Sequence, residues 1–472
     1  MRNQHLPAGF PLAPLSAWDD EAKELQDLMA HRVAMMARGL IRCTPDSQWL
    51  FWNGNNWEHD PGRVAVQACL DEVKMHTFQE VIGQHRGDRR LQAALTETNK
   101  NSGAQGVFGI LSRSGDIQTP LTAFDADPDL LNTPAGVYEL EAGEMTWHDQ
   151  NQLLTKITGA SYEPGSYEGS LFQETLHDCL PDEDKREYFQ RAMGSALSGR
   201  IRDHKLFILT GRGRNGKSLI MEAITATLGA YAGNIENSLL VQGINAGQPS
   251  AQEYANLADL KGLRLAVAHE LPHGVQLDQA LVKRLTGGDR IKAKYMHKNF
   301  FEFTPSHTIT LLTNDLPVID VNDPTIWTRL SIIEFTESFE GREDMDLPMK
   351  LSTDKERQAV LDWLIQGWHS YQQHRLKEPE SVKKALTEYQ LDSDQLQRFL
   401  DEKTERAKGC SISAKAFAEA LNSHALPGDK HMGYKEIKYQ MEKKNYKQGR
   451  SSGNIHWKDI RFKTRMTEQN AG

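Results

Sequence analysis

The chain has 472 residues, a net charge of −9, 39% hydrophobic and 25% charged residues. This length exceeds one hydrophobic core, so we expect two to four domains, and the composition is that of an ordinary soluble protein. No apolar run reaches the roughly eighteen residues of a membrane span, and the first residues lack a secretory core, which predicts a cytoplasmic protein without a membrane partner. The four cysteines lie far apart without a C-x-x-C pair, which argues against disulfides and structural zinc.

Two local basic segments stand out against the acidic net charge. Residues 291–300 contain Lys292, Lys294 and Lys298 and no acid, and residues 431–468 contain ten Lys or Arg against four acids. Such local asymmetry indicates contact with phosphate groups. For the C-terminal segment taken alone, an ordinary solvated surface is an equally good interpretation.

The N-terminal part, residues 1–165, reads as a helical, mixed α+β domain. A helix is expected from Ala17, with Asp19 and Asp20 at its start, and Gly39 should end it. The pair Asn53-Gly54 between tryptophan-rich segments predicts a β-hairpin, and residues 136–148 predict a second one. Another amphipathic helix should begin at residues 182–184 and end at Gly199.

From residue 206 strands and helices alternate along the chain. The expected elements are 206–210, 217–228, 263–268, 277–287 and 308–313. This alternation is typical of an α/β domain with a parallel, doubly wound sheet, here assigned to residues 166–345.

The remaining sequence is expected to be helical and then mixed. Helices at 355–375 and 379–401 form a helical segment over 346–405. Residues 406–472 read as short helices followed by two apolar segments around residues 449–453, which fits a basic winged-helix-like module.

The apolar strand 206–210 is followed by a complete P-loop, G-x-x-x-x-G-K-[ST]. Its residues are Gly211, Arg212, Gly213, Arg214, Asn215, Gly216, Lys217 and Ser218. The loop amides and the start of the next helix attract the oxygens of a triphosphate, Lys217 reaches the β- and γ-phosphates, and Ser218 is expected to bind Mg²⁺. A glycine turn that merely joins strand to helix is the alternative, and the flanking strand and helix argue against it. We therefore predict that the chain binds ATP with Mg²⁺.

Two later strands end in polar residues that suit phosphate chemistry. Glu270 follows the strand 263–268, where a carboxylate can polarise a water molecule against the γ-phosphate. Asn314 follows the strand 308–313, where its amide can contact both the γ-phosphate and that water molecule. The ordinary interpretations are a helix-capping glutamate and a turn formed by Asn-Asp-Leu-Pro.

Arg329 lies fifteen residues after Asn314. A planar, permanently charged guanidinium can stabilise the charge that develops on a transferring phosphoryl group, so Arg329 is a candidate arginine finger. A surface arginine beside a buried Trp327 is the competing interpretation.

These motifs and their order resemble superfamily 3 helicases. The similar segments are 211–218, the strand to Glu270, 285–291, Asn314 and 327–329, with further similarity at 132–140 and 191–199. The type that looks closest is the phage and plasmid replication primase-helicase, which is related to the poxvirus primase-helicase. The resemblance covers residues 130–345.

The resemblance implies a hexameric ring of AAA+ modules with ATP at the subunit interfaces. One subunit would supply Lys217, Ser218, Glu270 and Asn314, and its neighbour would supply Arg329. A hairpin within residues 286–303 would project into the channel, where Lys294, His297 and Lys298 contact single-stranded DNA. The alternation of Phe301-Glu302-Phe303 favours packed aromatic side chains over stacking on bases.

The chain departs from the family pattern at three places. His269-Glu270 replaces two consecutive acids, which leaves one carboxylate, and Thr328 replaces the first of two arginines, which leaves Arg329 alone as the finger. No primase motif is evident before residue 130. We therefore expect a helicase without a primase, with a separate primase as a further partner.

The principal interpretation is an ATP-driven replicative helicase of a phage, plasmid or related element that acts on single-stranded and forked DNA. An initiator or loader that uses ATP only to assemble at an origin is the alternative, and its C-terminal module would recognise duplex DNA. A P-loop kinase or packaging motor fits less well because nothing indicates a small-molecule acceptor site.

Overall fold

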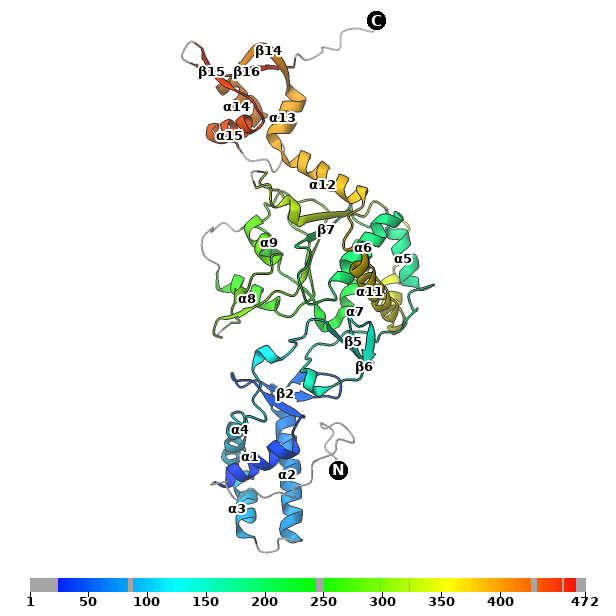
Figure 1. Cartoon of the computed structure of the whole chain (residues 1–472), viewed down its shortest axis with the longest axis vertical. Helices are drawn as coiled ribbons and strands as arrows, with labels where there is room; N and C mark the ends of the chain where they lie inside the picture. Colours follow the sequence, from blue (N-terminus) through cyan, green and yellow to red (C-terminus); the bar gives the residue numbers. More distant parts are fainter. Residues whose placement is uncertain are drawn as a thin grey trace.

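The computed structural model describes residues 24–83, 88–242, 250–296, 298–321, 323–425, 431–451 and 454–463. The molecule is elongated, with N-terminal helices at one end, a central region built on a parallel sheet, and a small C-terminal region at the other end (Figure 1). Among the residues the structure describes, no helix is long and apolar enough to cross a bilayer.

The N-terminal region packs helices against a small antiparallel sheet. Its elements are α1 (Leu25–Met36), β1 (Ile41–Cys43), β2 (Trp49–Trp52), β3 (Trp57–His59), α2 (Val64–Ile82), α3 (Arg89–Thr98), α4 (Asn101–Leu111) and η1 (Leu121–Ala123). The hairpin predicted at Asn53-Gly54 is confirmed, with Trp52 opposite Trp57. The described part of the first helix begins at Leu25, and the cap predicted at Asp19-Asp20 lies outside the described residues.

A second antiparallel sheet and two helices connect this region to the central sheet. They are β4 (Leu130–Thr133), β5 (Gly136–Glu139), β6 (Glu144–Thr146), η2 (Gln150–Gln152), α5 (Leu171–Cys179) and α6 (Glu183–Ser195). The hairpin predicted over 136–148 is present as β5 and β6, and β4 adds a strand that the sequence did not suggest. Asp182 caps α6 by accepting a hydrogen bond from the Lys185 amide, as the acidic start predicted.

The central region holds five parallel strands in the order β13-β7-β12-β9-β8. Its elements are β7 (Leu206–Thr210), α7 (Lys217–Leu228), η3 (Gly229–Tyr231), β8 (Ala232–Asn234), η4 (Asn237–Leu239), α8 (Ala251–Asp259), β9 (Leu265–His269), α9 (Gln279–Leu285), β12 (Thr308–Thr313), η5 (Trp327–Arg329) and β13 (Leu330–Glu334). The predicted parallel sheet is confirmed. The short β8 was not predicted because Ala232–Asn234 has no apolar run.

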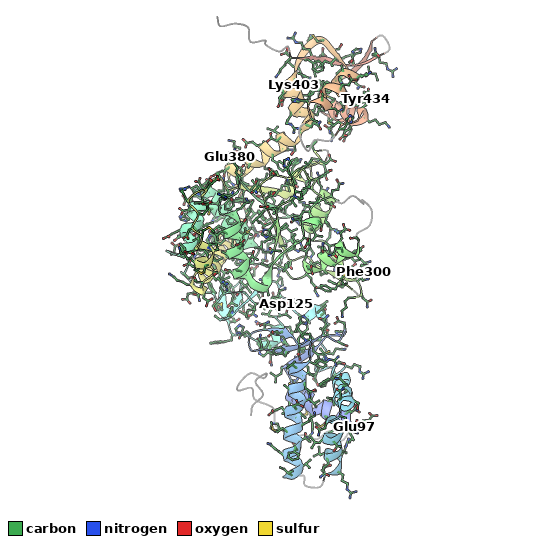
Figure 2. All side chains as sticks on the ribbon, turned by 180° about the vertical axis from the view of Figure 1, so that it is seen from behind. Glu97, Asp125, Phe300, Glu380, Lys403 and Tyr434 are labelled. Atoms are coloured by element: carbon green, nitrogen blue, oxygen red, sulfur yellow. The ribbon has the colours of Figure 1, made fainter. Side chains whose placement is uncertain are left out.

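The sheet is buried on both faces. Alternate residues of β7 enter two separate cores. Phe207 and Leu209 pack with α6, α7 and the later helix α11 (Asp354–His374), whereas Leu206 and Ile208 pack with α8 and α9. This explains why β7 is apolar throughout, as parallel strands covered on both faces are. A hairpin of β10 (Ile291–Ala293) and β11 (Phe301–Phe303) extends from the central region, with Phe300 near its tip (Figure 2).

Four helices follow the last strand of the sheet: the first two pack on the central core, and the last two lead to the C-terminal region (Figure 1). These are α10 (Leu347–Leu351), α11 (Asp354–His374), α12 (Glu380–Ser393) and α13 (Gln395–Lys403). The single helix predicted over 379–401 was wrong, because it divides at Asp394. The Asp394 carboxylate accepts a hydrogen bond from the Gln397 amide and starts α13 in a new direction.

The C-terminal region combines three helices with an antiparallel sheet in the order β14-β16-β15. After α13 come β14 (Thr404–Ser413), α14 (Ala414–Ser423), α15 (Tyr434–Lys443), β15 (Gln448–Ser451) and β16 (Asn454–Phe462). Phe399 of α13, Phe417 of α14 and Trp457 of β16 share one buried core. Packing therefore joins α13 to the strands and helices that follow it.

Candidate nucleotide-binding site

The P-loop joins the end of β7 to the start of α7. Gly211 and Gly216 have φ values of +156° and +81°. A Cβ added at Gly211 would lie 2.3 Å from the Phe335 carbonyl oxygen, and one at Gly216 would lie 2.1 Å from Cys179 Sγ. Neighbouring atoms thus leave no room for a side chain at either position. Gly216 supplies no capping side chain to α7, so the start of this helix can present amides to an anion.

Asn215 fastens the loop to the neighbouring strand. Its Nδ2 donates to the Phe335 carbonyl over 3.1 Å, just beyond β13, and its Oδ1 accepts from the Lys217 amide over 3.4 Å. Arg214 pairs with Glu343 at 3.1 Å and Glu340 at 3.5 Å, both in the segment after β13. Arg212 is exposed. Of the loop arginines, Arg214 is therefore turned toward acidic groups and not toward the loop centre.

Lys217 is buried at the centre of the site and contacts Asn314. Its Nζ donates to Asn314 Oδ1 over 2.6 Å and to the Gly211 carbonyl over 3.4 Å. Burial lowers the pKa of Lys217 below its ordinary value, and the nearby negative charge of Glu270 opposes that shift. A buried ammonium held only by neutral oxygens suits an anionic phosphate oxygen.

Glu270 and Asn314 lie at the same edge of the sheet as the P-loop. Leu312 of β12 is in register with His269, and Thr313 is in register with Thr210 of β7. The Glu270 amide donates to the Leu312 carbonyl over 2.7 Å, and its φ of +40° is left-handed. Its side chain is exposed, whereas His269 turns toward β8 and contacts Asn234 Oδ1 at 3.0 Å.

Mg²⁺ and ATP fit the side chains that gather here. The Ser218 side chain is exposed at the start of α7, and the structure records no hydrogen bond for its hydroxyl among the described residues. It can therefore serve as a metal ligand beside a phosphate. Elsewhere in the described ranges, no group of three or more His, Cys, Asp or Glu side chains is arranged to hold a metal ion.

Arg329 lies at the opposite edge of the sheet. It directly precedes β13, whose first residue is in register with the first residue of β7. With ~3.3 Å per residue, the length of a five-residue strand puts Arg329 roughly 16 Å from the P-loop edge. Its Nη1 contacts the Thr286 carbonyl at 3.4 Å, and no carboxylate in the described ranges pairs with it. The structure therefore does not bring Arg329 into the site of its own chain.

The β10–β11 hairpin presents positive charge and aromatic surface together. Lys292 Nζ and Lys294 Nζ lie 4.6 and 5.0 Å from the centre of the Phe300 ring. Tyr295 and Phe300 are 42% and 48% exposed, yet the Tyr295 ring stacks on Phe301 and the Phe300 ring packs edge-on against Tyr254, so the expectation of packed aromatic side chains holds in part. Phe303 is buried, as its position in the alternating pattern predicted. Lys298 is exposed near the tip, and His297 lies outside the described residues.

Sequence reasoning missed the groups that support the loop. Cys179 comes from α5, and Phe335 and Glu343 come from the segment after β13. None of them carries a local motif, and only the spatial approach of these segments reveals their contacts.

Comparison with known families supports this organisation. Residues 26–181 match the family described as D5 N terminal like, and residues 209–329 match a family of unknown function, DUF5906. The second match covers the P-loop, Glu270, Asn314 and Arg329. Together these matches make the chain similar to D5-type superfamily 3 helicases.

Curated proteins similar to this chain come from viruses. A protein of Acanthamoeba polyphaga mimivirus, whose given name proposes a helicase, is 27% identical over 403 residues, covering 77% of this chain and 42% of the relative. A protein of African swine fever virus, whose given name proposes a primase, is 22% identical over 332 residues, covering 64% of this chain and 34% of the relative. The chain thus spans less than half the length of these relatives.

The fold is also similar to a solved apo structure of the NrS-1 C-terminal region. The likeness covers 88% of this chain and 94% of that chain, with 12% sequence identity and a TM-score of 0.49.

Proposed function

We propose that the chain is an ATP-dependent replicative DNA helicase that works as a hexameric ring of AAA+ modules. ATP and Mg²⁺ bind at the P-loop, where Lys217 contacts the β- and γ-phosphates and Ser218 holds the metal. Glu270 orients and activates the attacking water molecule, and Asn314 responds to the γ-phosphate. The hydrogen bond between Lys217 and Asn314 supports this proposal because it marks the point where both side chains meet a phosphate.

The position of Arg329 carries the ring proposal. A finger residue must reach the γ-phosphate, yet Arg329 and the P-loop lie at opposite edges of one sheet. A second copy that sets its amino-terminal edge against the first copy's P-loop completes the site. This arrangement repeats head to tail, and such a contact forms a ring when the rotation closes.

Single-stranded DNA is the proposed ligand of the β10–β11 hairpin. Lys294 and Lys298 neutralise phosphates, and the exposed Tyr295 and Phe300 rings offer stacking surfaces to bases. His297 belongs to the same proposed contact by its place in the sequence. The forked junction is where translocation along one strand displaces the other.

Mixing two inactive variants tests the shared site. Lys217→Ala removes the phosphate contact within one chain, and Arg329→Ala removes the group offered to a neighbour. Each variant alone should be inactive, and a mixture should recover part of the ATPase activity because some sites then combine an intact Lys217 with an intact Arg329. No recovery would exclude Arg329 as a group supplied by a neighbour.

A second candidate function is an origin-binding initiator or loader. The element order α13-β14-α14-α15-β15-β16 has the topology of a winged helix, with α15 in the place of a recognition helix. Lys435, Lys438 and Lys443 are exposed on α15, which suits duplex DNA.

Strand displacement separates the two candidates. A helicase unwinds a forked substrate when it hydrolyses ATP, whereas a loader hydrolyses ATP and leaves the fork paired. The proposed setting is the replication of a phage, plasmid or related mobile element, with a primase supplied by another chain.

A further inference from the structure

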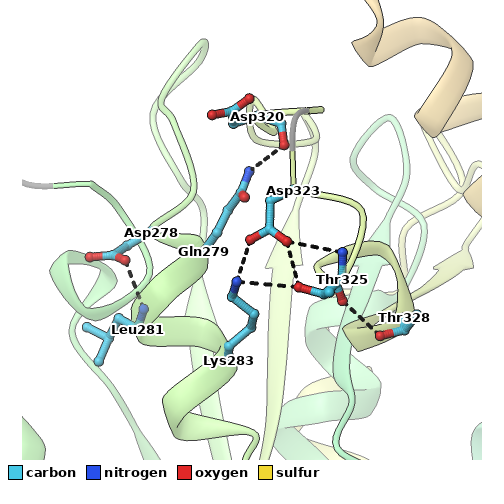
Figure 3. Close-up of polar contacts among 8 residues, drawn as sticks. All are labelled: Asp278, Gln279, Leu281, Lys283, Asp320, Asp323, Thr325 and Thr328. Carbon is cyan, nitrogen blue, oxygen red and sulfur yellow. Dashed lines mark hydrogen bonds and ion pairs between the residues drawn. The ribbon is translucent and has the colours of Figure 1, made fainter. Parts of the chain in front are cut away.

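The segment that carries Arg329 is fastened to α9 by a compact polar network (Figure 3). Lys283 of α9 forms an ion pair with the Asp323 carboxylate, and its Nζ also lies 3.4 Å from Thr325 Oγ1. Asp323 Oδ1 accepts from the Thr325 hydroxyl over 2.6 Å and from the Thr325 amide over 3.1 Å. One lysine thus holds both residues of the turn that leads into η5.

The network continues to within one residue of Arg329. The Thr328 hydroxyl donates to the Thr325 carbonyl over 2.8 Å, and the Arg329 amide donates to the Ile326 carbonyl over 2.8 Å. Ile326 and Trp327, which lie between, are buried in the sheet's core. The turn is therefore fixed by polar contacts on one side and by apolar packing on the other.

The same helix also supports the guanidinium end of Arg329. Arg329 Nη1 contacts the carbonyl of Thr286, the residue directly after α9. Lys283 and Thr286 are three residues apart, so a single turn of helix contacts both the base and the tip of the finger. A displacement of α9 or of the turn would move the guanidinium.

The electrostatics of Asp323 agree with a maintained ion pair. The hydrogen bond from Lys283 is the largest influence that lowers the pKa of Asp323, and the bonds from Thr325 act in the same direction. The carboxylate is therefore charged throughout the neutral range and holds Lys283 in place.

The network is also continuous with the nucleotide site of its own chain. The segment after Glu270 pairs with the segment after Asn314: the Leu277 amide donates to the Val318 carbonyl over 3.0 Å, and the Val318 amide donates to the Val275 carbonyl over 2.8 Å. These two segments lead into α9 and the turn at Asp323. Both partners of the network thus follow Glu270 and Asn314, the residues proposed to act at the γ-phosphate.

We propose that Lys283, Asp323 and Thr325 are positioning residues that hold Arg329 in the orientation required by the nucleotide site of a neighbouring copy. This inference rests on the proposed function, because it assumes that Arg329 acts across a subunit interface. The three residues do not touch the nucleotide; they act through Arg329 alone.

The test is Asp323→Asn, which removes the charge that holds Lys283 and leaves the size of the side chain nearly unchanged. Alone, it should lower kcat for ATP by about 10- to 100-fold, the effect expected of a finger displaced by about 1 Å, with KM changed less than about twofold. Its affinity for a non-hydrolysable ATP analogue and its unfolding midpoint should stay near those of the unaltered protein. Lys283→Met should act alike, and Lys283→Arg should keep most activity.

Rescue by a dead subunit distinguishes positioning from a structural defect. Lys217→Ala subunits cannot hydrolyse ATP but carry an intact network, so adding them should restore hydrolysis at the sites of Asp323→Asn subunits, as at those of Arg329→Ala subunits. Glu97→Gln is the matched control, because Glu97 forms an ion pair with Lys100 at 2.9 Å in the N-terminal region and its pKa is likewise lowered by that lysine. It should have unaltered kinetics.

Two results would overturn the inference while leaving the shared site intact. One is full kcat of Asp323→Asn alone; the other is a loss that Lys217→Ala subunits do not restore, although they restore Arg329→Ala. Failure to restore Arg329→Ala itself overturns the shared site, and this inference with it.

Discussion

Each edge of the central sheet buries a titratable side chain, Lys217 at the carboxyl edge and His307 at the amino edge. At the carboxyl edge, the ammonium of Lys217 is buried among neutral oxygens, and burial lowers its pKa. At the amino edge, the imidazole of His307 is buried, and its Nε2 contacts the Leu285 carbonyl at 3.2 Å. Burial lowers the pKa of His307 to about 4. His307 is therefore neutral at neutral pH, whereas the nearby carboxylate of Glu270 opposes the lowering of the Lys217 pKa.

The difference separates a binding edge from a supporting edge. A buried ammonium without an ion pair is unfavourable, so an anionic ligand beside Lys217 would stabilise its charged form. The neutral ring of His307 donates from Nε2 to the Leu285 carbonyl, and its Nδ1 is buried with no hydrogen-bond partner among the described residues. Arg329, the proposed finger, is half-buried at that amino edge and does not reach the nucleotide site of its own chain.

Lys217→Ala should cause the largest loss of nucleotide binding and hydrolysis at the carboxyl edge. It removes the only buried cation of the P-loop, so ATP hydrolysis should fall to background and affinity for a non-hydrolysable analogue should fall steeply. Lys217→Arg should also lose binding, because a planar guanidinium cannot reproduce the two contacts that the ammonium makes to Asn314 and Gly211. Titration with a fluorescent ATP analogue measures both. Wild-type affinity in Lys217→Ala would contradict the proposed site.

Gly216→Ala should damage the same edge by crowding. A Cβ there meets Cys179 Sγ at 2.1 Å and also requires a φ of +81°, which an alanine adopts only with strain. Nucleotide affinity should fall about 100-fold, which corresponds to ~2.7 kcal/mol. Adding Cys179→Ala should restore part of the affinity because it removes the clash and leaves the strain. An equal loss in the double variant would place the damage elsewhere.

The residues of the carboxyl edge were predictable because each ends an apolar strand or belongs to a local motif. The loop 211–218, Glu270 and Asn314 were proposed in this way, and the confirmed parallel sheet brings the strand ends together. The supports of that edge were not predictable. Cys179 and Phe335 approach the loop from distant parts of the chain, and only packing decides which distant segments meet.

At the amino edge, the sequence predicted which residue to consider but not the contacts that surround it. Arg329 could be named from its place after Trp327, yet the spacing does not reveal that the turn before it is tied to Lys283 of α9. Likewise, the basic hairpin was evident from composition, whereas the exposure of Tyr295 and Phe300 depends on how β10 and β11 meet. Long-range contacts of this kind leave no periodic signal in the sequence.

Acid should weaken the amino edge through His307. The unfolded chain binds a proton below pH ~6.5, whereas the buried ring does not until pH falls to about 4, so stability is full above the unfolded pKa and decreases as pH falls through this window. We expect a loss of about 2–3 kcal/mol from this group between pH 7 and pH 4.5. Urea unfolding at both pH values measures the change. In His307→Gln the free energy of unfolding should change less between the two pH values. A change as large as in the unaltered protein would show that His307 is not its source.

Lys298→Ala should have the smallest effect of these substitutions, and the effect should be on affinity for single-stranded DNA. The β10–β11 hairpin begins just after Thr286, so the amino edge supplies both Arg329 and the proposed DNA contact. Loss of one phosphate contact should weaken single-stranded DNA binding a few-fold at physiological salt and reduce the slope of log K against log salt by about 0.7. Fluorescence anisotropy across a salt series measures both quantities. Lys384→Ala on α12, far from the hairpin, serves as the control. A cation that contacts a phosphate releases a counterion when it binds, so the slope must change if Lys298 contacts DNA. An unchanged slope for Lys298→Ala would therefore exclude the hairpin tip from the DNA contact.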